Sequence, residues 1–330
     1  MAEWLYEEGI GENRAILVES GCIAEAVVEL PEVLRAGTVA TGRLAATLVP
    51  GRRGIVSLQE GIEALLEPVP AGVTEGAQIR VEVMREALPE PGRAKMPKVR
   101  VTEAEERRGP SLLQRLQASK HKVKALSPAG PDLLEEAGWS ELVEQAASGD
   151  IAFEGGSLRM SLTPAMTLFD VDGALPPAAL AVAGAEAAGR AIRRFGIGGS
   201  IGIDLPTTPS REDRQRAAAA LDAVLPQPFE RTAVNGFGFL QIVRRRERAS
   251  LPEIVQGDPI AASARALLRR TERSGGHGAR TLTAAPPVVA RIEQKPEWLE
   301  VLARRLGAPV ALRAEPGLAI SAGHVHSEHP

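Results

Sequence analysis

Cysteine is nearly absent from this sequence, which contains only Cys22. One cysteine cannot form an internal disulfide, and it excludes a zinc site built from cysteine pairs. Cys22 stands in an apolar, strand-like stretch, so we expect a small buried side chain. The histidines are His121, His277, His324, His326 and His329. They are scattered or gather at a C-terminal end that we expect to be frayed, so we expect no zinc.

Aromatic residues are also scarce, at 3% of the chain, and none occurs between Tyr6 and Trp139. No apolar run approaches the roughly 20 residues needed to cross a bilayer, and no basic and hydrophobic leader opens the chain. We therefore expect a cytoplasmic protein with no membrane partner. The 330 residues have room for one large domain with a smaller one inserted or appended, or for two modest domains.

A strong charge of either sign is lacking as well, because the net charge is only -3. The charges are nevertheless uneven, since residues 93–124 carry ten Lys and Arg against three acids. Local positive blocks of this kind favour phosphate backbones. The alternative is a solvated helix face.

Two short runs in the middle of the chain carry the most informative chemistry. Residues 168–173 (LFDVDG) and 201–206 (IGIDLP) each pass from apolar residues into an aspartate, Asp170 or Asp204. Residues 178–195 between them are rich in Ala, Leu, Val and Ile and carry arginines near their end, as expected for a helix packed on a sheet. This order predicts a strand, a right-handed crossover helix and a parallel strand. Both aspartates then lie at one edge of the sheet, where ligands of open α/β sheets bind.

Neighbouring carboxylates repel each other unless a cation lies between them. Mg²⁺ is usually held by one or two carboxylates together with water and phosphate oxygens. Asp170 and Asp204 are therefore candidate ligands of Mg²⁺, with Mn²⁺ as the other metal considered, and Asp172 adds a third acid nearby. The alternative is that these aspartates only cap or end their strands.

Residues 35–103 contain short β-type segments separated by glycines, at 37–44, 54–58 and 76–84, which predict a small barrel of the OB type. Their order resembles an S1 RNA-binding domain. OB barrels usually stack bases on aromatic rings above a basic groove, and this segment has no such ring. RNA binding here would depend on cations and be weak, salt-sensitive and blind to sequence. The candidates are Arg43, Arg52, Arg53, Arg80, Arg93, Lys95 and Lys98.

The rest of the chain alternates between helical and strand patterns. We expect hairpins at 13–29 and 151–162 and a strand region at 229–243. We expect a basic helix at 104–124 and further helices at 133–147 (capped by Asp132), 214–224 and 261–273, with linkers at 252–259 and 274–278. A terminal α/β appendage should contain a strand at Thr281, a helix at 297–306 and a strand at 310–313.

Several of these motifs, in this order, resemble the ribonuclease E/G family. The likeness rests on residues 155–158 (GGSL), 163–167 (TPAMT) and 169–173 (FDVDG), then on 187–194, 198–204, 237–251 (FGFLQIVRRRERASL), 280–282 and 306–310. It covers most of the chain, including the S1-like barrel. The resemblance implies an α/β fold: a hairpin joining the core (1–34), an S1-like OB barrel (35–103), a catalytic core (104–250), a linker and helix (251–279) and a small α/β subdomain (280–330).

The resemblance also implies an activity, the endonucleolytic cleavage of single-stranded RNA. In this family two aspartates hold Mg²⁺, which polarises the scissile phosphate while a metal-bound hydroxide attacks it. Asp170 and Asp204 match these metal ligands, and Asp172 stands where the family usually carries an orienting asparagine. The paired cysteines of the family's zinc link and its 5′-monophosphate reader have no counterpart. We therefore expect cleavage that is independent of the 5′ end, and a homodimer without a zinc link stays open.

Further cations and one amide are candidates for contacting RNA outside the barrel. They are Arg231, Asn235, Arg244, Arg245, Arg246 and Arg248. A solvated surface is the alternative for each arginine. Two other functions also stay open. One is an RNA-binding relative with weakened catalysis. The other is a phosphatase of the haloacid dehalogenase type, which residues 169–175 also resemble, although that function requires a doubly wound domain and a downstream lysine, and no lysine occurs between Lys124 and Lys295.

Overall fold

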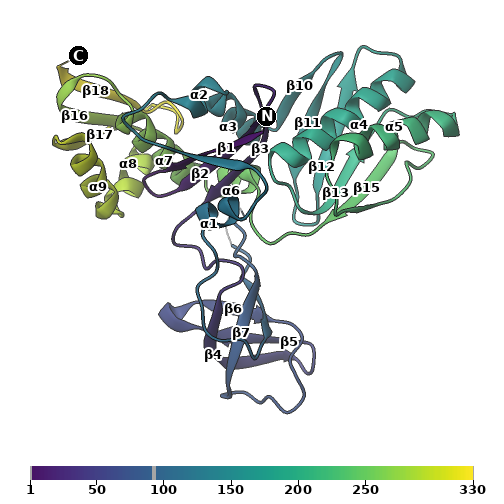
Figure 1. Cartoon of the computed structure of the whole chain (residues 1–330), viewed down its shortest axis with the longest axis horizontal. Helices are drawn as coiled ribbons and strands as arrows, with labels where there is room; N and C mark the ends of the chain where they lie inside the picture. Colours follow the sequence, from purple (N-terminus) through teal and green to yellow (C-terminus); the bar gives the residue numbers. More distant parts are fainter. Residues whose placement is uncertain (1, 91–93, 330) are drawn as a thin grey trace.

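The computed structural model describes residues 2–90 and 94–329 of the chain. A central sheet lies between three other units: a barrel below it, a six-stranded sheet with two long helices on one side, and the C-terminal unit on the other (Figure 1). The chain is thus a mixed α/β protein that contains a closed five-stranded barrel. None of the helices within the described ranges is long and apolar enough to cross a membrane.

The central sheet has the strand order β3-β2-β1-β9. Its strands are β1 (Glu3–Glu8), β2 (Asn13–Glu19), β3 (Cys22–Glu29) and β9 (Lys122–Leu126). The predicted hairpin at 13–29 is confirmed as β2 and β3. Both faces of this sheet are buried. Leu5 and Ile16 on one face belong to the large core cluster, and Trp4 and Leu17 on the other face belong to a cluster with Leu112 and Leu116 further along the chain. Cys22 is exposed, so the expectation of a buried thiol is wrong.

The predicted basic helix at 104–124 is also wrong. Only α1 (Leu112–Gln117) is helical there, and it begins at a capping box formed by Ser111 and Gln114. The following residues form β9, which pairs in parallel with β1. Without β9, the backbone N–H and C=O groups on that edge of β1 would lack hydrogen-bond partners. The need to pair these groups outweighs the helical pattern of the segment.

The barrel closes in the order β4-β5-β6-β8-β7. Its strands are β4 (Val39–Val49), β5 (Arg53–Ser57), β6 (Glu63–Leu66), β7 (Gln78–Arg85) and β8 (Lys98–Val101), and the 3₁₀ turn η1 (Gln59–Gly61) precedes β6. The segments predicted at 37–44, 54–58 and 76–84 contribute to β4, β5 and β7, whereas β6 and β8 were not foreseen. Apolar residues such as Leu44, Val56 and Val81 fill the interior.

The six-stranded sheet has the order β10-β11-β12-β13-β15-β14, and only β12 and β13 are parallel. Its strands are β10 (Asp150–Phe153), β11 (Gly156–Leu162), β12 (Thr167–Gly173), β13 (Gly199–Asp204), β14 (Glu230–Arg231) and β15 (Phe239–Arg244). The crossover helix α4 (Pro177–Arg194) joins β12 to β13, and α5 (Arg211–Val224) follows β13. The strand, helix and parallel strand predicted from the sequence are confirmed.

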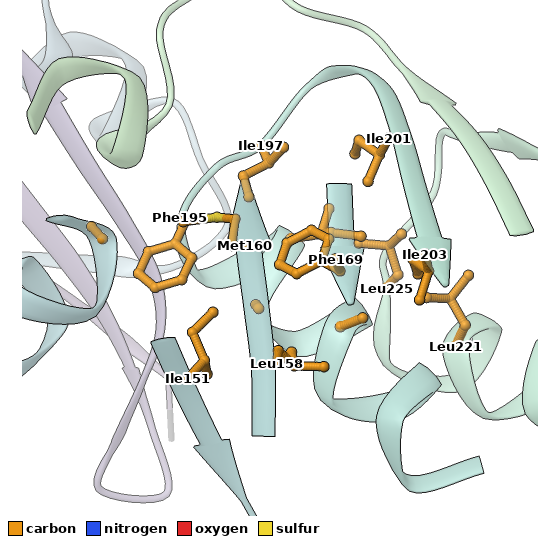
Figure 2. Packing of buried hydrophobic residues seen from close by; sticks show 14 of the residues in the cluster. Ile151, Leu158, Met160, Phe169, Phe195, Ile197, Ile201, Ile203, Leu221 and Leu225 are labelled. Carbon is orange, nitrogen blue, oxygen red and sulfur yellow. The ribbon is translucent and has the colours of Figure 1, made fainter. Parts of the chain in front are cut away.

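Strand alternation gives this sheet one covered and one open face. Phe169, Ile201 and Ile203 point into the core beneath α4 and α5, where they meet Leu221 and Leu225 (Figure 2). Their neighbours in the strands point to the other face. There the side chains of Ser157, Arg159, Ser161, Asp170, Asp172, Asp204 and Val243 are exposed.

Small residues bring α4 close to both the sheet and α5. A Cβ atom at Gly184 would collide with the side chain of Val171 on β12. A Cβ atom at Gly189 would lie 2.7 Å from Cγ2 of Val224 on α5. The helix is therefore tightly held between the strand that carries Asp170 and the next helix of the chain.

The segment predicted as helix 133–147 is divided. Asp132 caps α2 (Leu133–Glu136) by accepting a hydrogen bond from the Glu135 amide at 3.1 Å, as predicted. Gly138 then interrupts the chain at φ +97° before α3 (Trp139–Ser148). The stretch predicted as linker 252–259 is mostly helix α6 (Leu251–Gly257), so that expectation is wrong. Its capping box, Ser250 with Glu253, explains where the helix begins.

The C-terminal unit is built on a three-stranded sheet in the order β17-β16-β18. It contains α7 (Pro259–Glu272), β16 (His277–Ala284), α8 (Pro286–Glu293), α9 (Pro296–Leu306), β17 (Val310–Ala314) and β18 (His324–His329). The expected strands and terminal helix are confirmed. The C-terminal histidines are not frayed, because β18 pairs antiparallel with β16.

A buried network of charges joins the central sheet to α7. Its members are Glu7, Glu12, Arg14, Asp132, Arg265, Arg269 and Arg273. Arg14 pairs with Glu7 and with Glu12, the latter at 2.9 Å. Arg269 Nε lies 2.9 Å from Glu7 Oε1, and Arg273 Nε lies 3.0 Å from Glu7 Oε2. One glutamate in the first strand therefore holds the guanidinium groups of three arginines.

Candidate functional site

Asp170 and Asp204 lie directly opposite each other on the two parallel strands. They are paired in the register of β12 and β13. Paired residues on adjacent strands point to the same face, and the strands are about 4.8 Å apart. Both side chains are exposed on the open face. The expectation that the two aspartates meet at one edge is confirmed.

Asp172 lies on the same face because it follows Asp170 by two residues along β12. β13 ends at Asp204, so Asp172 extends beyond it and is flanked by Ser157 of β11 alone. At this edge two carboxylates therefore lie side by side, and the third lies two residues further along β12. All three side chains are exposed.

The chemistry of this arrangement suits a hard divalent cation. Two exposed carboxylates on adjacent strands repel each other when both are charged, and a cation between them removes this repulsion. Within residues 2–90 and 94–329, no group of three or more His, Cys, Asp or Glu side chains is placed to hold a metal ion. Such an ion at this edge would take Asp170 and Asp204 as two ligands and water or phosphate oxygens as the others, as is usual for Mg²⁺.

A cation that the sequence did not reveal flanks this pair. Arg159 of β11 is the register partner of Asp170, and on its other side it pairs with Asp150 of β10, with Nε 3.4 Å from Oδ1. One row across the open face thus reads Asp150, Arg159, Asp170, Asp204. The alternation of β11 indicates the exposed side of Arg159, but only the register of the folded sheet places it beside Asp170.

An apolar floor adjoins Asp204 on its other side. Phe239 of β15 is the register partner of Asp204. Its ring lies over Gly202, where an added Cβ would approach Cζ of Phe239 to 2.6 Å and Cδ2 of Leu168 to 2.8 Å. The carboxylates are therefore bordered by a cation on one side and by an aromatic ring on the other.

The turn between β14 and β15 lies at the same edge. Asn235, predicted as a hydrogen-bond donor to RNA, uses its side-chain oxygen within the turn, where it accepts from the amides of Phe237 at 2.9 Å and Phe239 at 3.0 Å. Gly238 accepts a hydrogen bond from the Leu205 amide at 3.2 Å, directly after Asp204. Asn235 thus lies near the aspartates, and it shapes the turn.

The arginines predicted to contact RNA lie at the opposite edge of the sheet. Gly199, at the start of β13, pairs with Arg244, whereas Asp204, at its end, pairs with Phe239. Five residues of strand, or about 17 Å, therefore separate Arg244 from the aspartate pair. Because β15 runs antiparallel to β13, these arginines do not lie beside Asp170 and Asp204, and their contact with RNA stays a prediction.

These arginines surround a pocket of about 350 Å³ and are partly neutralised. Arg245 lies 2.8 Å from Glu247, Arg248 lies 3.1 Å from Glu247 and 3.3 Å from Glu86, and Arg246 pairs with Glu253. Arg244 donates to the carbonyl of Ile197 at 3.0 Å. Arg115 also lines the pocket, and burial, aided by the charge of Arg248, lowers its pKa to about 10.

The remaining predicted cations are dispersed. Arg231 is held by Asp222, with Nε 2.7 Å from Oδ1. On the barrel, Arg53 and Lys98 share Glu67, Lys95 pairs with Glu90, and Arg43 and Arg80 donate to the carbonyls of Gly76 and Ala104, both at 3.1 Å. Arg52 is exposed. Arg93 lies outside the described residues.

Comparison with known proteins adds no assignment. No protein-family model matches the sequence, and no curated protein matches it significantly. The aspartate pair and the motifs of the sequence are therefore the features that point to a function.

Proposed function

We propose that this protein is a metal-dependent endoribonuclease that cleaves single-stranded RNA, as the ribonuclease E/G proteins that it resembles do. One observation carries the proposal: Asp170 and Asp204 are register partners on parallel strands and are exposed on one face of the sheet. In a family whose chemistry requires two metal-bound aspartates, this is the arrangement that the sequence motifs lead us to expect.

The residues at the edge have distinct roles in this proposal. Asp170 and Asp204 hold Mg²⁺ or Mn²⁺ through their carboxylates. When bound, the metal stabilises the negative charge that develops on the phosphate and lowers the pKa of a coordinated water. Asp172 adds negative charge beyond the pair and takes the place of the asparagine that has an orienting role in the family. Arg159 contacts phosphate oxygens of RNA that approaches from the side of β11.

Access to the pair favours cleavage within a strand. The aspartates lie on an exposed face, and the described residues place no side chain of α4 or α5 over them, because these helices cover the other face. An RNA strand can therefore approach from the side without passing an end through a channel. RNA that reaches the aspartates in this way does not have to bind through its 5′ end.

Two other functions are alternatives to the nuclease. The phosphatase requires a doubly wound parallel sheet, and this sheet has a single parallel pair, so we do not favour it. An RNA-binding relative with weakened catalysis is favoured by Asp172, which stands where the family usually carries an asparagine. The complete aspartate pair argues against it.

Cleavage of a fluorescent single-stranded RNA with Mg²⁺ or Mn²⁺ tests the proposal. We expect wild-type protein to cut the RNA, and both Asp170→Asn and Asp204→Asn to reduce cutting to the level of buffer alone. Asp150→Asn is the matched control, because Asp150 is exposed in the same row of the sheet but two strands from Asp170. It should still cut RNA well above the level of buffer alone, because it loses only the ion pair with Arg159 and keeps both aspartates of the pair.

Each other outcome selects a different function. Binding of RNA without cutting in either metal would support the RNA-binding protein and overturn the nuclease. Release of phosphate from small esters without RNA cutting would support the phosphatase. Loss of cutting in Asp150→Asn equal to that in Asp170→Asn would show that the pair has no special role.

A further inference from the structure

The chain has three Trp, one Tyr and six Phe, and all ten lie in the described part of the chain. Nine of them are buried or half-buried. Phe237 alone is exposed, with 83% of its surface accessible. Exposing a large aromatic side chain has a cost in water, so its position requires an explanation.

Phe237 is presented by a turn with little freedom. The Asn235 side chain accepts hydrogen bonds from the amides on both sides of Gly238, those of Phe237 and Phe239. Thr207 donates its hydroxyl hydrogen to the Phe237 carbonyl at 3.1 Å. Gly238 adopts φ +95°, and a side chain there would collide with the Leu205 carbonyl. The ring is therefore held out on a fixed backbone.

The turn lies at the edge that carries the aspartates. Phe237 precedes Phe239, the register partner of Asp204, by two residues, and the Leu205 amide bonds to Gly238 between them. Phe237 therefore lies in the turn next to the strand end that carries Asp204, where a base next to a phosphate held at Asp204 can reach its ring.

We propose that Phe237 is a stacking platform for an unpaired base of the RNA, adjacent to the scissile phosphate. This inference rests on the proposed function and adds to it the recognition of the base. The barrel offers no aromatic ring to a single strand, so the sheet edge supplies the π surface that the barrel lacks. Stacking tolerates every base, and cleavage thus has a weak dependence on sequence.

Binding to a base-bearing and an abasic strand of equal length tests the platform. The probes are fluorescent oligouridylate and an oligomer of ribose phosphate without bases. Both are measured by anisotropy with Ca²⁺ in place of Mg²⁺, so that the aspartates can hold a hard cation, and the strand length is checked after each measurement to show that no strand was cut. Phe237→Ala should lower the affinity for oligouridylate by roughly 5- to 150-fold, the range found for loss of one stacked base. Its affinity for the abasic strand should equal that of wild type.

Two variants serve as controls. Phe237→Trp keeps a stacking surface and should retain wild-type affinity for oligouridylate. Val243→Ala removes an exposed apolar side chain from the far end of the neighbouring strand β15 and should change neither affinity, since Val243 is 49% exposed but lies at the opposite edge.

The outcomes separate this inference from the nuclease itself. Equal loss of affinity for both strands in Phe237→Ala, or no loss for either, would overturn the platform even if wild-type protein cuts RNA in Mg²⁺. A base-dependent loss in a protein that does not cut RNA would support the platform and overturn the nuclease.

Discussion

Replacing Glu7 with glutamine would test the buried charge network that joins the central sheet to α7. The Glu7 side chain is 1% exposed and pairs with Arg14, Arg269 and Arg273. Burial alone would raise its pKa, but the three guanidinium groups outweigh burial and lower the pKa from 4.5 to about 2. Glu7→Gln removes the charge and leaves three buried arginines without their shared partner.

The lowered pKa of Glu7 gives the expected contribution of its charge to the free energy of unfolding. The difference between 4.5 in the unfolded chain and about 2 in the folded protein corresponds to about 3 kcal/mol of stability, at about 1.4 kcal/mol per pKa unit. Because the folded-state pKa is the lower one, this contribution is complete above about pH 5. It falls to about 1.4 kcal/mol at pH 3 and nearly vanishes at pH 1. Breaking a buried ion pair typically costs about 3–5 kcal/mol, which agrees with the value at neutral pH.

Urea unfolding at pH 7 and pH 3, followed by tryptophan fluorescence, would measure this contribution. Trp4, Trp139 and Trp298 are all buried and lie outside the barrel, so their signal reports on the units that the network joins. Glu8→Gln is the matched control, because it removes an exposed glutamate from the same strand. It should leave the free energy of unfolding within about 0.5 kcal/mol of wild type.

Glu7→Gln should be less stable than wild type by about 3 kcal/mol at pH 7, and the gap should narrow by about 2 kcal/mol at pH 3. A gap of the same size at both pH values would refute the electrostatic reasoning, because it would mean that packing and not charge is lost. A variant as stable as wild type at pH 7 would refute the role of the network.

Two further predictions concern the open sheet and the arginine pocket. Gly202→Ala should destabilise the protein by about 1–3 kcal/mol, because its Cβ would lie 2.6 Å from the Phe239 ring. Calorimetry should show no such loss for the control Gly236→Ala, since no atom lies within 4 Å of a Cβ there. Equal melting temperatures for the two variants would contradict crowding at Gly202. Arg245→Ala removes an exposed guanidinium group from the arginine pocket. It should weaken RNA binding and reduce the slope of the logarithm of the RNA-binding constant against the logarithm of the salt concentration by about 1. An unchanged slope in a salt titration followed by anisotropy would exclude a phosphate contact at Arg245.

Local patterns in the sequence were sufficient for the elements that form the aspartate pair. The two apolar runs that end in Asp170 and Asp204, with an alanine-rich segment between them, indicated parallel strands joined by a helix, and the register confirms it. The glycine-punctuated segments of the barrel were equally informative. In both cases the signal lies within a few residues, and no distant partner has to be known.

Other features depended on distant partners, so the sequence could not reveal them. The direction of β15 decides whether Arg244 or Phe239 lies beside Asp204, and this direction follows from the short strand β14 and its turn. The strand β9 forms because β1 requires a neighbour. A local signal for α6 was available, since Ser250 followed by Glu253 has the spacing of a capping box.

The close packing of α4 has a consequence for the evolution of the edge that carries the aspartates. Val171 lies between Asp170 and Asp172 in sequence, and its side chain fills the space that Gly184 leaves empty behind the strand. A larger residue at position 184 would push β12 outward and alter the spacing of the carboxylates without replacing either aspartate. A helix on the opposite face from the aspartate pair is thereby restricted in the side chains it can accept, and mutations that change the carboxylate spacing can be expected on the far side of the sheet as well as at its rim.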